Sequence, residues 1–511
     1  MDHCAAVLRN FPPTAGNAAS LYDDVYDKLI KAHINRVQRL FKDSAAVVAA
    51  HAIELLNSLD PATHTYSYLS LIDTILPADA ALYDSSEPIV AEKILAFLMA
   101  FDPRQVRYVG SAFTHLFTAV GSGRIIPASI AVEALAQALQ KLDPSGAMLT
   151  SNHLALARLA YHTDNALPAL AALNKDIVFF PGAAPHRETE RLCSLSLPPP
   201  SFISKDTGLT LPLKSTQVLD FDHLVGLLNC SVRDWEASHA AFARVISHPT
   251  RDNGVSKIMI EAHKKWVLTG LLLNGKVPTT PPNTTPYVSK AFSVVNKAYV
   301  QMAENFESPS AEMLVAEATP STGVFLADGN ESLVKEVLSA HPKWQIAHLR
   351  KVYVTVSIAD IRTTIKDSPP TTVPGSDAET ESLLQGMIDT GMIRAAIRRP
   401  AAAAAAAAAE GEAAGASENT YLEFLPEEEM TEADFAKEMA VAVKRIRVLK
   451  PLYKVTNEQL SLNRDYLKQV LRDQKREKEA AEREGTGAGS SIGDGLFYEA
   501  DPDDEDLMTG P

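Results

Sequence analysis

Residues 255–273, VSKIMIEAHKKWVLTGLLL, decide the predicted fold. Their apolar side chains recur at steps of three and four, which is the spacing of one face of an α-helix. Gly275 follows this stretch and tolerates the positive φ of a helix end. We interpret the apolar face as a core face rather than a binding site, because apolar residues at helical spacing usually pack. The face comprises Met259, Ala262, His263, Trp266, Gly270 and Leu273, and the opposite face carries Lys257, Glu261, Lys264 and Lys265.

Residues 1–180 are predicted to be N-terminal helical repeats. Residues 20–176 have the pattern of successive helices joined by short turns that contain Gly, Pro or Asn. Pro127 suits the start of one helix, and Thr150 can cap the next. Hairpins of such helices cannot bury their apolar faces alone, so we expect them to stack into an α-solenoid. Two apolar stripes support this prediction: Ile30, Ile34, Val37 and Phe41, then Val106, Val109, Phe113, Leu116 and Val120.

Residues 181–218 interrupt the helical pattern with several prolines, including the run at 198–200. A segment of this length and composition predicts a long surface loop, inserted without disturbing the stack. Helical spacing resumes in residues 219–340, which we assign to the helical part of the next domain. Its further helices are expected at 287–305 and 331–351.

A change of period from 3.6 to 2 marks a different substructure, assigned to residues 341–426. Val352, Val354 and Val356 alternate with polar or aromatic residues and predict a strand. Capping patterns at 357–360 and 376–379 open two helices. Two more strands, at 393–397 and 420–425, would form a hairpin. This order is compatible with a winged helix, whose wing is lengthened by Pro400 and the alanine run 401–409.

Residues 427–484 are predicted to be C-terminal assembly helices. Phe435, Met439, Ala442, Ile446 and Leu449 step by four, three, four and three, which is the seam spacing of a coiled coil. Pro451 is expected to end or kink this helix, and a charged helix should follow from about 458 to 483. Residues 485–511 carry many acids and neither Lys nor Arg, so they are expected to be a disordered acidic tail.

The run from Phe221 through Trp235 and Phe242 to VSKIMIEAHKKWVLTGLLLNGKVP resembles the subunit 3 family of the constitutive photomorphogenesis 9 signalosome, whose members contain a PCI domain. The similarity is densest there and collinear from roughly residue 90 to 475. The Pro-rich segment, the alanine run and the acidic tail depart from the family.

This resemblance implies a non-catalytic scaffold subunit in a complex that removes a ubiquitin-like modifier from cullins (deneddylation). It implies other PCI subunits and metallo-isopeptidase-type subunits as partners, and cullin-RING ubiquitin ligases as indirect partners. Winged helices of the family line up edge to edge, and C-terminal helices gather in a bundle. The expected location is cytoplasmic and nuclear.

Composition narrows the classes of partner. The 511 residues carry a formal net charge of −15, which disfavours binding to nucleic acid or to an anionic membrane. Cys4, Cys193 and Cys230 are too few for a disulfide framework or a thiolate metal site. No apolar window is long enough for a transmembrane helix, and the N-terminus lacks the pattern of a signal peptide. We therefore expect a soluble intracellular protein with protein partners.

The motifs of catalysis are incomplete. A metallo-isopeptidase needs His-x-His, and this pattern does not occur in the sequence. Residues 270–277, GLLLNGKV, have phosphate-loop spacing but lack the final hydroxyl, and 489–493, GSSIG, lie in the acidic tail. We therefore expect no catalytic residue, no metal and no cofactor.

The remaining functional prediction is an assembly interface formed by the seam and the hairpin. Alternatively, the seam packs on its own domain. A PCI subunit of the proteasome lid and a nucleic-acid-binding winged-helix protein are the other candidate functions; the second is disfavoured because residues 377–391 carry acids and no Lys or Arg. The predicted interface residues are Phe435, Met439, Ala442, Ile446, Leu449, Ile393 and Ile397.

Overall fold

The computed structural model describes residues 2–13, 22–76, 88–181, 191–249, 254–307, 311–365, 376–398, 420–426 and 431–462, and some positions up to 475. It divides the chain into two compact units, Met1–Glu427 and Glu428–Pro511. Helices dominate the described part, and its named strands form one three-stranded sheet. The mostly α-helical fold with stacked helices that the sequence predicts is confirmed. The alanine run and the acidic tail lie outside the described residues.

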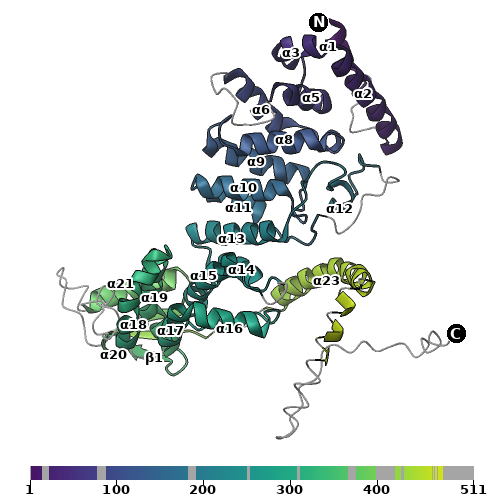
Figure 1. Ribbon diagram of the computed structural model, residues 1–511. Coiled ribbons are helices and arrows are strands. Elements are labelled where there is room, and N and C mark those ends of the chain that lie inside the picture. The colour runs from purple at the N-terminus through teal and green to yellow at the C-terminus, as the bar shows by residue number, and fades with distance from the viewer. Residues whose placement is uncertain are drawn as a thin grey trace, which may run out of the picture. The chain divides into compact units, whose positions relative to one another are not determined.

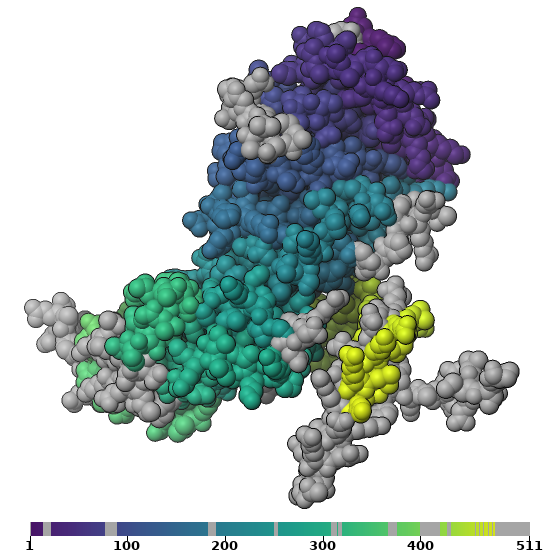
Figure 2. Space-filling view, viewed as in Figure 1, coloured from purple at the N-terminus to yellow at the C-terminus, as the bar shows by residue number. Residues whose placement is uncertain are grey.

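The first unit begins with a stack of helices. Helices α8, α9, α10, α11 and α13 lie against their neighbours in the stack (Figure 1), and Figure 2 shows them as successive bands of blue and teal. One hydrophobic core runs through the stack from Cys4 to Ala241. The helices are α1 (Asp2–Leu8), α2 (Asp23–Asp43), α3 (Ala45–Ala50), α4 (Ala52–Asn57), α5 (Thr65–Ile75), α6 (Pro88–Ala100), α7 (Pro103–Val106), α8 (Gly110–Gly121), α9 (Ala128–Leu142), α10 (Ser151–His162), α11 (Ala166–Leu173), α12 (Pro199–Phe202) and α13 (Ser215–Ser231).

A row of aromatic rings joins neighbouring helices in this core. Tyr68 of α5 stacks on Phe97 of α6, and the row continues through Phe101 to Phe113 and Phe117 of α8. Successive ring centroids lie 5.5–6.1 Å apart, within the range preferred by aromatic pairs. The row therefore contributes packing between layers that a single amphipathic helix cannot supply.

The apolar stripe from Val106 to Val120 does not belong to one helix. Helix α7 ends at Val106 and α8 begins at Gly110, so the stripe crosses a turn. The backbone of Gly110 lies against another segment, because an added Cβ there would be 2.3 Å from the carbonyl oxygen of Thr207. This long-range contact explains the break, which the local periodicity does not show.

The prediction of a long surface loop at 181–218 is wrong for its described part. Residues 191–214 pack on α7 and α8, and Cys193, Phe202 and Leu209 are buried among them. The hydroxyl of Thr114 donates to the carbonyl oxygen of Gly208 at 2.8 Å. The short helix α12 also lies in this segment. Proline content indicated a loop correctly at the level of the backbone, but it does not determine whether that backbone is buried.

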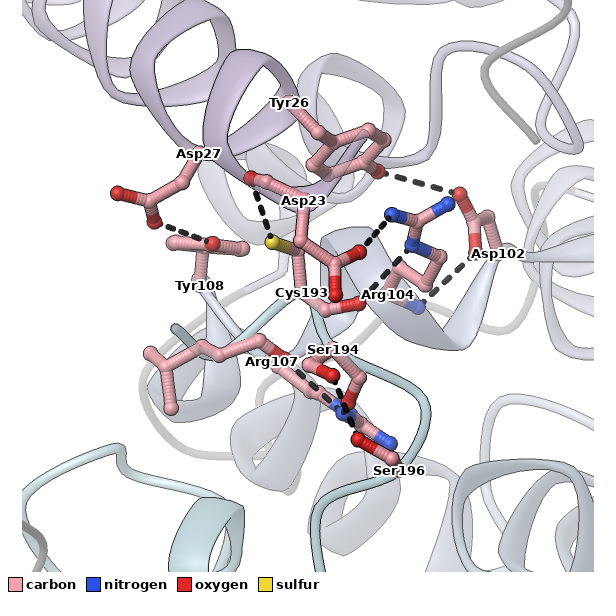
Figure 3. Close-up of polar contacts among 11 residues, drawn as sticks. Asp23, Tyr26, Asp27, Asp102, Arg104, Arg107, Tyr108, Cys193, Ser194 and Ser196 are labelled. Carbon is pink, nitrogen blue, oxygen red and sulfur yellow. Dashed lines mark hydrogen bonds and ion pairs between the residues drawn. The ribbon is translucent and has the colours of Figure 1, made fainter. Parts of the chain in front are cut away.

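Arg104 of α7 ties the buried segment to the N-terminal helix α2 (Figure 3). Its Nε donates to the carbonyl oxygen of Cys193 at 3.0 Å, and a terminal nitrogen pairs with the Asp23 carboxylate at 3.1 Å. The thiol of Cys193 donates to the carbonyl oxygen of Asp23 at 3.3 Å. The guanidinium also stacks on the Tyr26 ring, 4.1 Å from its centroid. Three parts of the chain thus meet at one arginine.

Arg107 holds the same segment one turn further on. One of its terminal nitrogens donates to the carbonyl oxygens of Leu192 and Ser194 at 2.9 and 2.6 Å. Its guanidinium lies 3.6 Å from the centre of the Phe202 ring. Burial lowers the pKa of Arg107, and neighbouring Arg104 lowers it further. The arginine therefore acts as a structural clamp that satisfies backbone carbonyls.

The stretch 255–273 forms the centre of a second helical core. Helix α15 (Lys257–Asn274) packs against α13, α14 (Trp235–Ile246), α17 (Lys297–Phe306) and α19 (Glu331–Leu349). Its predicted apolar face is buried except for Leu273, which is half-buried, and Gly275 ends it with φ of 62°. The helix expected at 287–305 is two helices, α16 (Pro286–Val295) and α17. They separate at Asn296, whose side-chain amide donates to the carbonyl oxygen of Ile260 at 3.1 Å.

One charged residue on the opposite face of α15 is buried. The Lys264 ammonium pairs with Glu261 at 2.6 Å and with Asp328 at 2.8 Å. Tyr299 donates its hydroxyl hydrogen to Asp328 at 2.8 Å. Burial alone lowers the pKa of Lys264, but the hydrogen bonds to Asp328 and Glu261 outweigh this effect and raise it. The network joins α15 to α17 and to the turn after α18 (Ala311–Ala327), a helix that the sequence patterns did not reveal.

A small sheet completes the first unit. Strands β1 (Thr355–Ser357), β3 (Tyr421–Phe424) and β2 (Ala395–Arg398) lie antiparallel in that order, with α20 (Ile358–Ile365) and α21 (Asp377–Asp389) between β1 and β2 in the chain. The predicted order of strand, helix, helix and hairpin is therefore present. The first strand is shorter than expected: it begins at Thr355, and Val352 and Val354, which precede it, are about three-quarters exposed.

The second unit contains one long described helix, α23 (Glu432–Ser461). Thr431 caps its first turn, where the side chain accepts a hydrogen bond from the backbone N–H of Asp434. Pro451 lies inside the helix, so of the two predicted outcomes, an end or a kink, the end is wrong. Proline removes one backbone hydrogen bond, but on an exposed helix water can satisfy the carbonyl that is freed.

Candidate assembly surfaces

Helix α23 presents an apolar face with no described partner within its own unit. Phe435, Met439 and Ile446 are 50–60% exposed, and Leu449 is 39% exposed. Ala442 is exposed between them. Large apolar side chains at seam spacing on a helix are normally covered by another helix. This set of five residues, which we call the seam, is therefore a candidate surface for binding another chain.

A second apolar face on α23 escaped the sequence prediction. Val441 and Val448 are exposed and seven residues apart, so they lie on the same side of the helix. Val448 follows Ile446 by two residues, which turns it by about 200° from the seam. Tyr453, 59% exposed, extends the seam itself. The seven-residue spacing of the two valines was the available signal, but it is too short a pattern to stand out in a sequence.

Charge is unevenly distributed along α23. Residues 444–454 contain Lys444, Arg445, Arg447, Lys450 and Lys454 and no acidic residue. The first turn instead carries Glu432 and Asp434. A partner helix with acids near the C-terminal half of α23 would complement it electrostatically, which favours one orientation over the other.

The sheet offers two further edges, because β3 is central and β1 and β2 are not paired on their outer sides within the described residues. Ile393 and Ile397 of the hairpin were predicted to lie in the interface. Ile393 is only 4% exposed and Ile397 packs partly against the same core, so the prediction is wrong for Ile393 and unsupported for Ile397. Both side chains point into the core under the sheet, where α20 and α21 also contribute.

The exposed apolar residues near the sheet lie instead at β1. Val352, Tyr353 and Val354 precede this strand and are 50–74% exposed. The carbonyl oxygen of Val354 accepts from the N–H of Phe424 at 2.8 Å, so ladder pairing extends to this residue. An exposed edge strand next to apolar side chains is a template for pairing with another chain. Sequence alternation included these valines in the strand because it could not locate the strand's true start at Thr355.

The described residues do not assemble a catalytic constellation. No group of three or more His, Cys, Asp or Glu side chains among them could hold a metal ion. His33, His153 and His263 are buried, and burial lowers the pKa of each to about 4, so they act as neutral core residues. In the GLLLNGKV stretch, the first glycine is inside α15 and the second ends it, which is not the geometry of a phosphate loop. The GSSIG stretch lies outside the described residues.

None of the described helices is both long and apolar enough to span a bilayer.

The chain is similar to known subunits of one complex. A family model described as "COP9 signalosome complex subunit 3, N-terminal helical repeats" matches residues 25–192 and 201–288, which include most of the segment that the sequence suggested was an insertion. A Neurospora crassa protein named COP9 signalosome complex subunit 3 is 35% identical over 518 residues, covering 100% of this chain and 99% of that protein. The Emericella nidulans protein of the same name is 29% identical over 371 residues, covering 71% and 74% of the two chains. The resemblance noticed in the sequence is thus confirmed, and the chain belongs to the COP9 signalosome complex subunit 3 family.

Proposed function

We propose that this chain is a non-catalytic scaffold subunit of a signalosome that removes the ubiquitin-like modifier from cullins and so regulates cullin-RING ubiquitin ligases. Membership of the subunit 3 family supports a role within a complex. The observation that carries the scaffold role is the seam on α23, whose apolar side chains have no described partner in their own unit. Burying a large apolar side chain contributes roughly 1.5–3 kcal/mol, so such a seam can hold a subunit in an assembly.

The partners in this proposal are other PCI subunits and a metallo-isopeptidase-type subunit, in the cytoplasm and the nucleus. We further propose that β1, α20, α21, β2 and β3 act as a winged helix that adds the β1 edge to a neighbouring sheet. Its α21 carries Asp377, Glu379, Glu381 and Asp389, a surface that disfavours contact with phosphate. No observation among the described residues favours the nucleic-acid alternative over protein assembly.

Purification of an affinity-tagged chain from its own cells tests the proposal. Native mass spectrometry should find it with signalosome subunits, and the purified complex should remove the modifier from a cullin while the isolated chain does not. Co-purification with proteasome-lid subunits would support the alternative PCI assembly. A gel shift at low salt that persists at physiological salt would instead support nucleic-acid binding.

A further inference from the structure

A groove of about 520 Å³ lies in the first unit, where α14, α15 and α19 meet the turn after α21. This volume is within the range of sites that accept a large side chain or a small ligand. Its lining is a mixture of apolar and polar groups. The lining residues are Trp235, Leu272, Leu273, Glu336, Ser339, Ala340, Lys343, Trp344, Thr390 and Met392.

The ring of Trp344 is held in place at this groove. A Cβ on Gly275 would be only 2.3 Å from the ring, so the indole lies directly on the backbone at the end of α15. The His348 ring lies one helical turn further along α19, and its centroid is 6.3 Å from that of the Trp344 ring. The indole N–H has no acceptor among the described residues. The groove thus contains a fixed aromatic wall whose indole nitrogen is itself buried.

The cations around the groove are available for a partner. Lys343 lines it, is exposed, and has no ion-pair partner among the described residues. Lys351 and Lys276 lie near the His348 ring, one helical turn from Trp344, and both lower its pKa, in addition to the larger effect of burial.

The nearby carboxylates are already engaged. Glu336 pairs with Arg233 at 3.2 Å. Glu307 accepts a hydrogen bond from the backbone N–H of Val277 at 2.7 Å. Within the groove lining, Lys343 is therefore a cation without an ion-pair partner among the described residues, on a chain whose formal net charge is −15.

We propose that this groove binds an acidic segment of a partner protein that inserts one aromatic or long aliphatic side chain. The two tryptophans and Met392 supply the apolar contact area for the anchor. Lys343, Lys276 and Lys351 select carboxylates beside it, because charge complementarity favours the matching partner and speeds its association. This site extends the proposed scaffold function, because it uses neither the seam of α23 nor the β1 edge.

Selection from a random peptide library on the immobilised full-length chain tests the proposal. The expected peptides carry one large apolar residue between acids. Synthetic copies should change the intrinsic tryptophan fluorescence, since two of the three tryptophans line the groove and Trp266 is buried in a core. Lys343→Glu should weaken binding about fivefold, and added salt should weaken it as well.

Two variants make the test specific. Ser339→Trp fills the groove and should abolish binding, whereas Lys290→Glu makes the same charge change on α16, away from the groove, and should leave the affinity unchanged. Circular dichroism checks that each variant folds. If Ser339→Trp does not fold, the peptide affinities of Lys343→Glu and Lys290→Glu are compared instead. Peptides without acids, or equal binding by Lys343→Glu and Lys290→Glu, would overturn the proposal. Self-association that depends on this groove would identify a second copy as the occupant and would also overturn it.

Discussion

Lys264 shows that a lysine on the charged side of an amphipathic helix can be a core residue. Its side chain is 11% exposed, and its ammonium lies between Glu261 and Asp328. The sequence pattern placed it opposite the apolar face, which is correct, but Asp328 in the turn after α18 covers its ammonium group as well. A buried charge that loses its partner costs several kcal/mol of stability. Removing one side chain of this network should therefore lower the free energy of unfolding substantially.

Asp328→Ala should therefore destabilise the first unit by about 2 to 3 kcal/mol. It removes one partner of the Lys264 ammonium and the acceptor of the Tyr299 hydroxyl, while Glu261 still offsets part of the charge. Urea denaturation followed by circular dichroism measures the loss. Lys335→Ala is the control, because its pair with Glu331 is exposed, and the expected change is under about 0.5 kcal/mol. Equal effects of the two substitutions would contradict the assignment of a buried network.

The buried histidines predict acid sensitivity. The pKa values of His33, His153 and His263 are about 4 in the folded chain and about 6.5 when unperturbed. The unfolded chain therefore binds more protons between these values, so stability falls as pH falls from 6.5 towards 4. Each such histidine contributes a slope of up to about 1.4 kcal/mol per pH unit. Melting temperatures measured from pH 7.5 to 5 should decline below pH 6.5, and His33→Gln should reduce the steepness. A melting temperature that does not change with pH would show that these rings become protonated without loss of stability.

At the scale of elements, α23 carries the sharpest test of assembly. Ile446→Asp places a carboxylate in the centre of the seam, where burial against a partner would cost several kcal/mol. Because Ile446 is 60% exposed in the described structure, the isolated chain should keep its helicity and melting temperature. Co-purification with the other subunits should be lost. Val448→Asp tests in the same way whether the second apolar face takes part in assembly.

Ala440→Asp is the matched control for Ile446→Asp. It adds the same charge to an exposed position about 100° around α23 from Met439, on the side that also carries Lys444. This variant should enter the complex normally. If Ile446→Asp unfolded the isolated chain, the seam would pack internally; if it assembled as well as Ala440→Asp, the seam would have no assembly role.

Gly110→Ala tests whether the Pro-rich segment is part of the fold. The added Cβ would be 2.3 Å from the carbonyl oxygen of Thr207, and backbone cannot yield there without separating the segment from α8. We expect a loss of about 2 kcal/mol, typical of overpacking, in urea denaturation. Gly323→Ala is the control, since an added Cβ there has no atom within 4 Å. Gly323 is inside α18, so its replacement should be neutral or slightly stabilising. Comparable losses at both glycines would show that the segment is not packed as described.

The sequence predicted elements better than it predicted their surroundings. Periodicity located α15 and its end at Gly275, and the caps at Thr150 and Ser376 form as expected. These features depend on residues within one or two helical turns. The break at Asn296 depends on distant partners, here Ile260 and His263, so local spacing could not reveal it.

The same limit applies to the candidate site. The seam could be predicted because its spacing depends on a single helix, whereas its binding to another chain stays a prediction. Ile393 was misplaced because the burial of a strand face is decided by the helices beneath the sheet. The groove between α14, α15 and α19 has no sequence signature, since its lining residues come from separate segments spread between Trp235 and Met392.

At the scale of the whole molecule, we propose that this subunit folds without a metal ion, whereas the reaction of its complex depends on one. Its described residues offer no metal-binding group, and its cores are apolar. A zinc chelator should therefore leave the thermal transition of the isolated chain unchanged, and metal measurement should find no stoichiometric zinc. In the purified complex the same chelator should stop removal of the modifier from cullins, because we propose that a metallo-isopeptidase-type partner carries out that reaction. One tightly bound zinc per isolated chain, or cleavage by that chain alone, would overturn the non-catalytic role while leaving its family membership intact.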